Sequence, residues 1–248
     1  MSIKNPLRYP GAKSKLYDYI CKLLIAEQRT GCTFYEPFAG SAAISLLLLE
    51  NQVISKAVLN ELDPLLYNFW FSVFNHTEEL ITLIRNTDIT LENWHEFSLY
   101  RNNDYLQDKT SVQIGFAGLF LNRTNFSGIL KANPLGGLNQ QSQYPINCRF
   151  NKDKIINSIQ QLSLYGNKIT LYNLDAIDFM KQALRYKRNR KTFVYIDPPY
   201  YKEGANLYRC YYTHEQHMLL SKFILSKTYP WLISYDNAEE IRKMYKQL

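Results

Sequence analysis

The sequence predicts an α/β protein with a mostly parallel sheet, interrupted by a mainly helical insertion. Short β-branched and aromatic runs alternate with amphipathic segments toward both ends of the chain, a pattern typical of parallel α/β folds. Between them, residues 65–120 show helical periodicity with no strand pattern. Residues 122–150 are rich in Asn, Gly, Gln and Pro. The 248-residue length suits one α/β domain that carries such an insertion.

The N-terminal part predicts a strand–helix–strand unit. After a turn-rich start over residues 5–15, apolar residues at helical spacing predict a helix from about residue 16, closed by Gly31. A strand over 33–35 leads through a turn into a helix over 42–50, and a second strand covers 56–59. Two strands joined in this way are expected to be parallel, with a right-handed crossover.

The remainder divides into the insertion and a second α/β part. We assign residues 1–64 and 151–248 to the α/β domain and residues 65–150 to the insertion, whose turn-rich end predicts an exposed hairpin or loop. In the last part, helices are expected over 154–164, 175–184 and 214–226, and strands over 169–172, 193–196 and 231–235. Asn237 and Glu240 have the spacing of a capping box for a final helix.

Composition limits the classes of function. A net charge of +7 and a pI near 9.1 favour a polyanionic partner. The four cysteines contain no C-x-x-C pair, and His214 and His217 have no evident third ligand, so we expect no metal site. The chain has no apolar run that could span a bilayer and no signal peptide, so we expect no membrane partner and a cytoplasmic location.

The tetrad Asp197-Pro198-Pro199-Tyr200 ends the apolar strand over 193–196. Prolines stop the strand because they cannot donate a ladder hydrogen bond. A carboxylate, a proline carbonyl and an aromatic ring therefore gather at the carboxyl end of a strand, where ligands bind in open α/β sheets. Two acceptors beside a flat ring suit an exocyclic amine and the plane of a base. The tetrad predicts chemistry on an amino group of a nucleobase.

A second candidate site follows the first strand. The turn over 36–41 joins a strand to a helix, and Glu61 ends the next strand. A small-residue turn lets the backbone approach a ligand, and an acidic residue about twenty positions later commonly binds ribose hydroxyls. The turn lacks both G-x-G-x-x-G and G-K-[ST]. The pair of signals predicts an adenosine-containing cofactor, whereas Asp63 before Pro64 suits a helix start.

Two basic segments have less specific interpretations. The N-terminal run 8–13 taken alone is a turn with solvated charges, although Lys13 could pair with a cofactor carboxylate and Tyr9 could pack on the cofactor. Five cations over residues 185–191 could contact DNA phosphates. That cluster precedes a strand and lies at the opposite end of the sheet from Asp197, so we interpret it as a solvated loop.

Taken in order, the motifs resemble those of Dam-like DNA adenine N6-methyltransferases. The matching blocks are residues 5–13, 35–41, 60–64 and 197–200, together with Asn122-Arg123-Thr124-Asn125-Phe126-Ser127-Gly128, which resembles the start of the family's DNA-recognition hairpin. Residues 234–236 resemble a further block. The resemblance covers nearly the whole chain, and five blocks in register are a specific signal.

The resemblance implies a Rossmann-like methyltransferase sheet with S-adenosylmethionine as cofactor and double-stranded DNA as partner. It places cofactor contacts at Tyr9, Pro10, Gly11, Lys13, Glu36, Pro37, Phe38, Gly40, Ser41, Glu61, Asp175 and Asp197. It places DNA contacts at Arg123, Asn125, Lys131 and Asn133. It assigns catalysis to Asp197, Pro198 and Tyr200.

The implied reaction is direct methyl transfer to a flipped-out adenine. Asp197 and the Pro198 carbonyl would accept the two N6 hydrogens, and Tyr200 would stack on the base. The N6 atom would then attack the sulfonium methyl in line, without a covalent enzyme intermediate. The alternatives are methylation of cytosine N4 or of an RNA base, and a catalytically weak DNA-binding relative.

This chain departs from the family pattern at several positions. Ala12 replaces a glycine, and Glu61 replaces the usual aspartate. In the hairpin, Lys131 stands where family members commonly have arginine, which reads guanine bidentately, so we do not expect a GATC target. The chain also ends at Leu248, where relatives usually continue, so we expect a truncated or a short form of the family.

Overall fold

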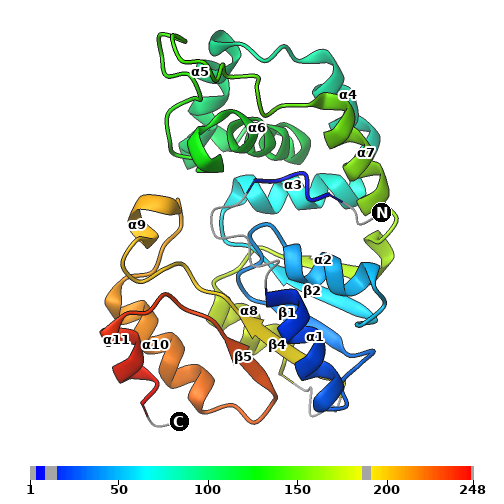
Figure 1. Cartoon of the computed structure of the whole chain (residues 1–248), viewed down its shortest axis with the longest axis vertical. Coiled ribbons are helices and arrows are strands. Elements are labelled where there is room, and N and C mark those ends of the chain that lie inside the picture. The colour runs from blue at the N-terminus through cyan, green and yellow to red at the C-terminus, as the bar shows by residue number, and fades with distance from the viewer. Residues whose placement is uncertain (1–3, 9–15, 186–190, 247–248) are drawn as a thin grey trace.

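The computed structural model describes residues 4–8, 16–185 and 191–246. A five-stranded sheet, in the order β3-β2-β1-β4-β5, forms its lower layer in Figure 1. Its strands are β1 (Thr33–Glu36), β2 (Lys56–Asn60), β3 (Ile169–Tyr172), β4 (Thr192–Ile196) and β5 (Trp231–Ile233). All four pairings are parallel. The predicted strands are confirmed, although the last is two residues shorter than expected.

The strand register brings the predicted sites to one edge of the sheet. β1 lies between β2 and β4, with Glu36 opposite Leu59 and Tyr35 opposite Val194. Because parallel strands share the direction of their carboxyl ends, the residues that follow β1, β2 and β4 meet at that edge. The strand order reverses between β1 and β4, which is where such sheets open a ligand site.

Helices cover both faces of the sheet, as the alternation of side chains along β1 requires. Phe34 packs in a core with α1 (Tyr17–Ala26) and α2 (Ala43–Glu50). Tyr35 packs in the opposite core with α8 (Ala176–Ala183) and α10 (His214–Leu225). The predicted parallel α/β architecture is therefore confirmed.

The final helix, α11 (Glu239–Met244), differs from its predicted start. Its N-cap is Ala238, without a side-chain cap, so the capping box predicted from Asn237 and Glu240 is wrong. The helix begins one residue later than that motif required, and Asp236 just before it is bonded to the loop after the tetrad.

The upper part of the molecule is helical (Figure 1). It comprises α3 (Pro64–Asn75), α4 (Thr77–Asn86), α5 (Leu91–Ser98), α6 (Ser111–Thr124) and α7 (Lys152–Ser163). Asp63 caps α3 by accepting from the Leu65 amide at 3.0 Å, which confirms its predicted helix-start role. α6 is buried on nearly every side and packs along α3. One hydrophobic core runs through this layer and one face of the sheet, so the boundaries at residues 64 and 150 stay a prediction.

The turn-rich stretch is a loop rather than a regular hairpin. Asn122 to Thr124 form the last turn of α6, and a 3-10 turn (Phe126–Gly128) follows. The described pairing across the loop is an isolated antiparallel bridge between Asn125 and Pro134. The Asn125 amide donates to the carbonyl oxygens of Ile129 and Leu130, both at 2.9 Å. A side chain thus binds carbonyls that a strand partner would otherwise bind.

Candidate active site

A cavity opens at the carboxyl edge of the sheet, below the helical layer. It has about 1070 Å³ of free space, counting its open mouth. Several predicted site residues line it together: Glu36, Phe38, Gly40, Ser41, Glu61 and Asp197. They come from the segments after β1, β2 and β4, so the fold joins two sites that are far apart in the sequence. A cavity at this edge of an open α/β sheet is a candidate ligand site.

The turn after β1 is held in a strained, closely packed form. Gly40 and Ala42 both have φ of +49°, in the left-handed region that disfavours most side chains. The Gly40 amide donates to Glu61 Oε2 at 2.8 Å, and its carbonyl accepts from Trp70 Nε1 at 2.9 Å. Pro37 is tied in as well, because its carbonyl accepts from Asn60 at 2.9 Å. The turn is therefore fixed against β2 and α3 before any ligand binds.

Glu61 joins the turn after β1 to the loop after β2. Its second carboxylate oxygen, Oε1, accepts from the Asp63 amide at 2.9 Å. Burial, and then the neighbouring Asp63 carboxylate, raise the pKa of Glu61 to about 7. Glu61 is partly exposed and lines the cavity, so its carboxyl oxygens are within reach of hydroxyl groups of a ligand.

Asp175 begins α8, and its two carboxylate oxygens have separate partners. Oδ1 accepts from the Ile177 amide at 2.8 Å, and Oδ2 accepts from the Tyr212 hydroxyl at 2.8 Å. Tyr212 lines the cavity and packs edge-on against Phe38, with ring centroids 5.3 Å apart. Sequence reasoning missed Tyr212, because it lies in an irregular segment without a recognisable motif. The structure therefore links Asp175 to the cavity through Tyr212.

The Asp197 carboxylate is oriented by its neighbours. Ser234 Oγ donates to Asp197 Oδ1 at 2.6 Å, and the Tyr195 hydroxyl lies 2.9 Å from the same Ser234 oxygen. Pro198 is buried, whereas Asp197 and Tyr200 are partly exposed. The Tyr200 ring meets the ring of Tyr208 at a centroid distance of 6.1 Å. Asp197 thus faces the cavity in a restricted orientation.

Asp236 fixes the chain that follows the tetrad. Asp236 accepts from the backbone amides of Tyr201, at 2.8 Å, and Lys202, at 3.2 Å. Together with Ser234, it accounts for the sequence block at residues 234–236, which fixes both ends of the tetrad loop.

Glu36 predicts a pH dependence of stability. It is 3% exposed, and burial, partly offset by a hydrogen bond from Ser45, raises its pKa from 4.5 to about 8. The folded state therefore binds more protons than the unfolded state between those two pH values, and stability falls as pH rises through this range. Glu36→Gln should remove this component, so its unfolding free energy should fall less between pH 5 and pH 8 than that of the wild type.

Denaturant unfolding at both pH values measures this difference. Glu27→Gln serves as the control, because Glu27 is an exposed glutamate beyond the end of α1. An equally steep loss of stability in Glu36→Gln and in the wild type would contradict the raised pKa.

The predicted DNA residues occupy different positions on the loop. Lys131 and Asn133 are exposed, and Lys131 donates to the Ala205 carbonyl of the segment after the tetrad. Asn125 is fully buried and accepts from Trp94 Nε1 at 2.7 Å, in addition to its two donated bonds. In this conformation the Asn125 side chain shapes the loop and has no surface for a direct DNA contact.

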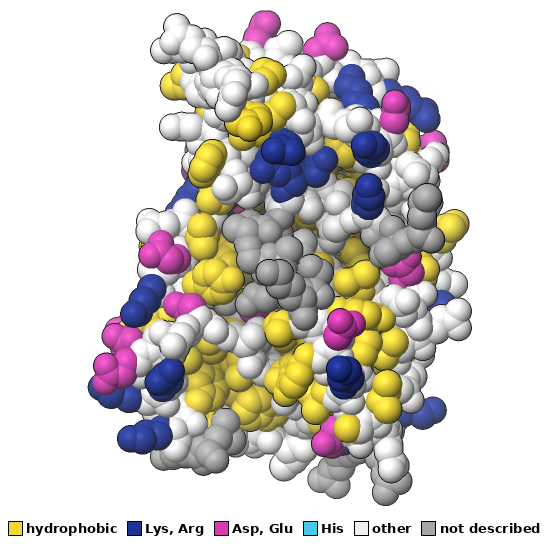
Figure 2. Space-filling model, viewed as in Figure 1, with side chains coloured by type: hydrophobic (Ala, Val, Ile, Leu, Met, Phe, Trp, Pro, Cys, Tyr) yellow, Lys and Arg dark blue, Asp and Glu magenta, His cyan; other side chains and the backbone are white. Residues whose placement is uncertain are grey.

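Arg123 belongs to a group of three arginines. Burial, followed by the neighbouring charges of Arg8 and Arg149, lowers its pKa to about 10. Arg8 Nη1 also donates to the Asn125 carbonyl at 3.3 Å. Figure 2 shows basic side chains gathered on the helical layer of this face. Such a group favours an anionic partner.

Some predictions lie outside the described residues. Tyr9, Pro10, Gly11 and Lys13 belong to residues 9–15, and most of the basic cluster at 185–191 falls in residues 186–190. The predicted contacts at these positions stay predictions. Among the described residues, no group of His, Cys, Asp and Glu has the arrangement of a metal site. No helix in that part of the chain is both long and apolar enough to cross a bilayer.

Fold and site together define a Rossmann-like methyltransferase: a parallel sheet with an acidic, glycine-bearing cavity and an Asp-Pro-Pro-Tyr loop at its switch point. More narrowly, the chain belongs to the D12 class of N6 adenine-specific DNA methyltransferases, whose family model matches residues 9–248. The predicted family and enzyme class are confirmed.

Three type II methyltransferases are among its relatives. M1.LlaDCHI of Lactococcus lactis subsp. cremoris is 26% identical over 245 residues, which cover 97% of this chain and 75% of that protein. M.MjaIII of Methanocaldococcus jannaschii is 25% identical over 210 residues, covering 81% and 70%. M.CviBI of Paramecium bursaria Chlorella virus NC1A is 26% identical over 215 residues, covering 86% and 76%.

Proposed function

We propose that this protein is a site-specific DNA methyltransferase that transfers a methyl group from S-adenosylmethionine directly to N6 of a flipped-out adenine in double-stranded DNA. The observation that carries the proposal is the shared cavity. Glu36 and Glu61 line the side of the cavity that we assign to the cofactor, and Asp197 lines the side that we assign to the target base. Ile129 and Leu130 complete the cavity, and they belong to the loop after α6 that carries the predicted DNA contacts, which we name the DNA loop. A family member with this arrangement can bring a base and a cofactor into one site.

The residues present fit an adenosyl cofactor. The Glu61 carboxyl group, which lines the cavity, offers acceptors for a ribose diol, and Phe38, Leu62 and Tyr212 offer apolar surface for a base. The positive-φ turn at Gly40 leaves no Cβ between its backbone and a ligand. When bound, S-adenosylmethionine supplies an electrophilic methyl group on a positively charged sulfur. The Asp197 carboxylate, which lines the same cavity, suits that charge.

The tetrad supplies the acceptors for the target amine. Asp197, oriented by Ser234, and the Pro198 carbonyl would accept the two N6 hydrogens, and Tyr200 would stack on the ring. Accepting these hydrogens localises the nitrogen lone pair, which is delocalised into the ring in free adenine. Flipping the base costs a few kcal/mol, which stacking on Tyr200 and contacts to the DNA loop would offset.

Nucleoside analysis tests the proposal. Purified enzyme is incubated with S-adenosylmethionine and DNA that lacks adenine methylation, and the digested product is analysed by mass spectrometry. We expect N6-methyladenine in double-stranded DNA. N4-methylcytosine, methylated RNA with unmodified DNA, or binding without any methyl transfer would each refute the assignment. Single-molecule sequencing of the same product maps the recognition site.

Lys131 predicts an effect on DNA recognition. It is exposed on the loop next to the cavity, so Lys131→Ala should either change the preferred site or weaken DNA binding about tenfold. The measurement is methylation-site sequencing combined with DNA binding over a range of salt concentrations. A lost phosphate contact lowers the salt slope by about one, whereas a lost base contact relaxes one position of the site.

The control for Lys131 is Lys22→Ala, which removes the same charge from the exposed surface of α1. Arg123→Ala tests the same surface. If Lys131→Ala and Arg123→Ala both methylate the same sites at wild-type rates, the loop does not recognise DNA.

A further inference from the structure

The segment after the tetrad reaches from the sheet toward the helical layer. In Figure 1 it carries α9 (Gly204–Leu207) on the side of the molecule. Leu207, Tyr208, Arg209 and Cys210 all line the cavity. This segment therefore forms a wall of the site and connects the two layers.

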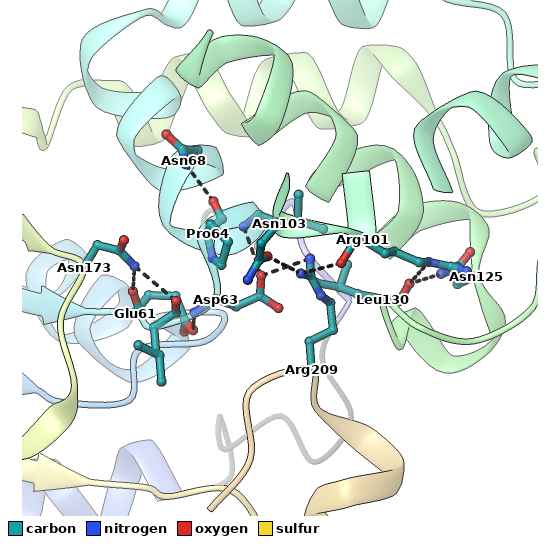
Figure 3. A network of polar contacts seen from close by, with 12 residues as sticks. Glu61, Asp63, Pro64, Asn68, Arg101, Asn103, Asn125, Leu130, Asn173 and Arg209 are labelled. Carbon is teal, nitrogen blue, oxygen red and sulfur yellow. Dashed lines mark hydrogen bonds and ion pairs between the residues drawn. The ribbon is translucent and has the colours of Figure 1, made fainter. Parts of the chain in front are cut away.

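Arg209 is the buried cation of this segment. Its side chain is 11% exposed, and Nη1 lies 3.4 Å from Oδ1 of Asp63, which is 6% exposed. Nη2 donates to the Arg101 carbonyl and to Asn103 Oδ1, both at 3.0 Å (Figure 3). Asp63 also caps α3 two residues after Glu61. One guanidinium thus joins the acidic loop after β2 to the turn at residues 101–103 of the insertion.

Arg101 extends this connection to the DNA loop. Its Nε donates to the Leu130 carbonyl and its Nη2 to the Ala132 carbonyl, both at 2.8 Å. The guanidinium carbon lies 5.1 Å from the centroid of the Trp94 ring. Leu130 itself lines the cavity. The four residues Asp63, Arg101, Asn103 and Arg209, which we name the Arg209 bridge, therefore connect two walls of the cavity through the protein.

We propose that Arg209 is a positioning residue that makes cofactor binding and DNA binding strengthen each other. The inference rests on the proposed function, because it takes the Glu61–Asp63 side as the cofactor side and residues 129–133 as the DNA side. Because the bridge is one connected set of contacts, a ligand that fixes one end of it also fixes the position of the wall that the other ligand meets. Arg209 suits this role because a planar guanidinium faces a carboxylate and donates to two further acceptors in one geometry.

Calorimetry measures this coupling on the full chain. S-adenosylhomocysteine is titrated with and without a duplex carrying the mapped recognition site, or a mixed-sequence duplex if the wild type methylates nothing. For the wild type, DNA should raise the affinity for S-adenosylhomocysteine about fivefold or more. Arg209→Lys keeps the positive charge beside Asp63 but loses the planar set of guanidinium donors. The increase in S-adenosylhomocysteine affinity caused by DNA should therefore fall below about twofold. Arg242→Met, on exposed α11, should retain the wild-type enhancement.

A second variant separates a loss of coupling from a loss of folding. Removing Arg209 alone would leave a buried Asp63 charge without its partner, which is strongly destabilising. Asp63→Asn combined with Arg209→Met removes both charges, and thermal unfolding reports whether each variant is folded. If folded Arg209→Lys or the folded double variant keeps the full enhancement, or if the wild type shows none, the inference is wrong. Absence of N6-methyladenine from the wild-type product would instead refute the proposed function. The binding measurement would still show whether the Arg209 bridge couples the two binding sites.

Discussion

Replacing Asp197 with alanine is expected to lower the methylation rate about 10³-fold. The carboxylate lines the cavity and accepts from Ser234 at 2.6 Å, and it is the acceptor that we propose for the target amine. DNA affinity should change little, because the proposed DNA contacts come from the loop after α6. Single-turnover methylation and a separate DNA-binding titration measure the two effects.

Two further variants make the Asp197 result specific. Asp197→Asn keeps an acceptor for Ser234 but loses the negative charge, so its rate should also fall sharply. Asp178→Ala removes an exposed aspartate of α8, which pairs with Lys181 on the surface, and should methylate normally. Near-normal turnover in Asp197→Ala would overturn the role of the tetrad carboxylate.

Gly115→Ala is expected to lower the free energy of unfolding by about 3 kcal/mol. A Cβ at this position of α6 would lie 2.4 Å from the Asn68 carbonyl oxygen and 2.7 Å from the Phe69 amide nitrogen, both in the backbone of α3. Backbone atoms cannot rotate away, so the two helices must separate. Because α3 begins directly after the Glu61–Asp63 loop, the shift should also weaken cofactor binding.

Gly166→Ala is the matched control for this prediction. A Cβ there would meet its nearest atom, the Phe74 carbonyl oxygen, at 3.4 Å, so its stability should change by less than about 0.5 kcal/mol. Denaturant unfolding compares the two variants with the wild type. Equal stabilities of Gly115→Ala and Gly166→Ala would show that the α3–α6 contact is not close-packed.

Local sequence information predicted the sheet and the approximate position of each site. Apolar periodicity located the five strands, and the prolines after Asp197 marked the end of β4, because both signals depend on residues adjacent in the chain. The same reasoning predicted the wrong cap for α11, because Asn237 and Glu240 have the local spacing of a capping box. The DNA contact at Asn125 was implied by the family resemblance and stays a prediction, and the burial of that side chain depends on contacts with distant segments such as Trp94.

The parallel α/β class, the family and the residues at the ends of β1, β2 and β4 all follow from the amino-acid sequence. The burial of Glu36, the raised pKa of Glu61, the bond between Tyr212 and Asp175, and the link that Arg209 makes from Asp63 to the insertion all depend on the tertiary structure. The physical reason is that periodicity and turn residues act over a few neighbouring positions. Burial and ion pairing arise between segments brought together by folding, and Arg209 lies 146 positions beyond Asp63 in the sequence (209 − 63).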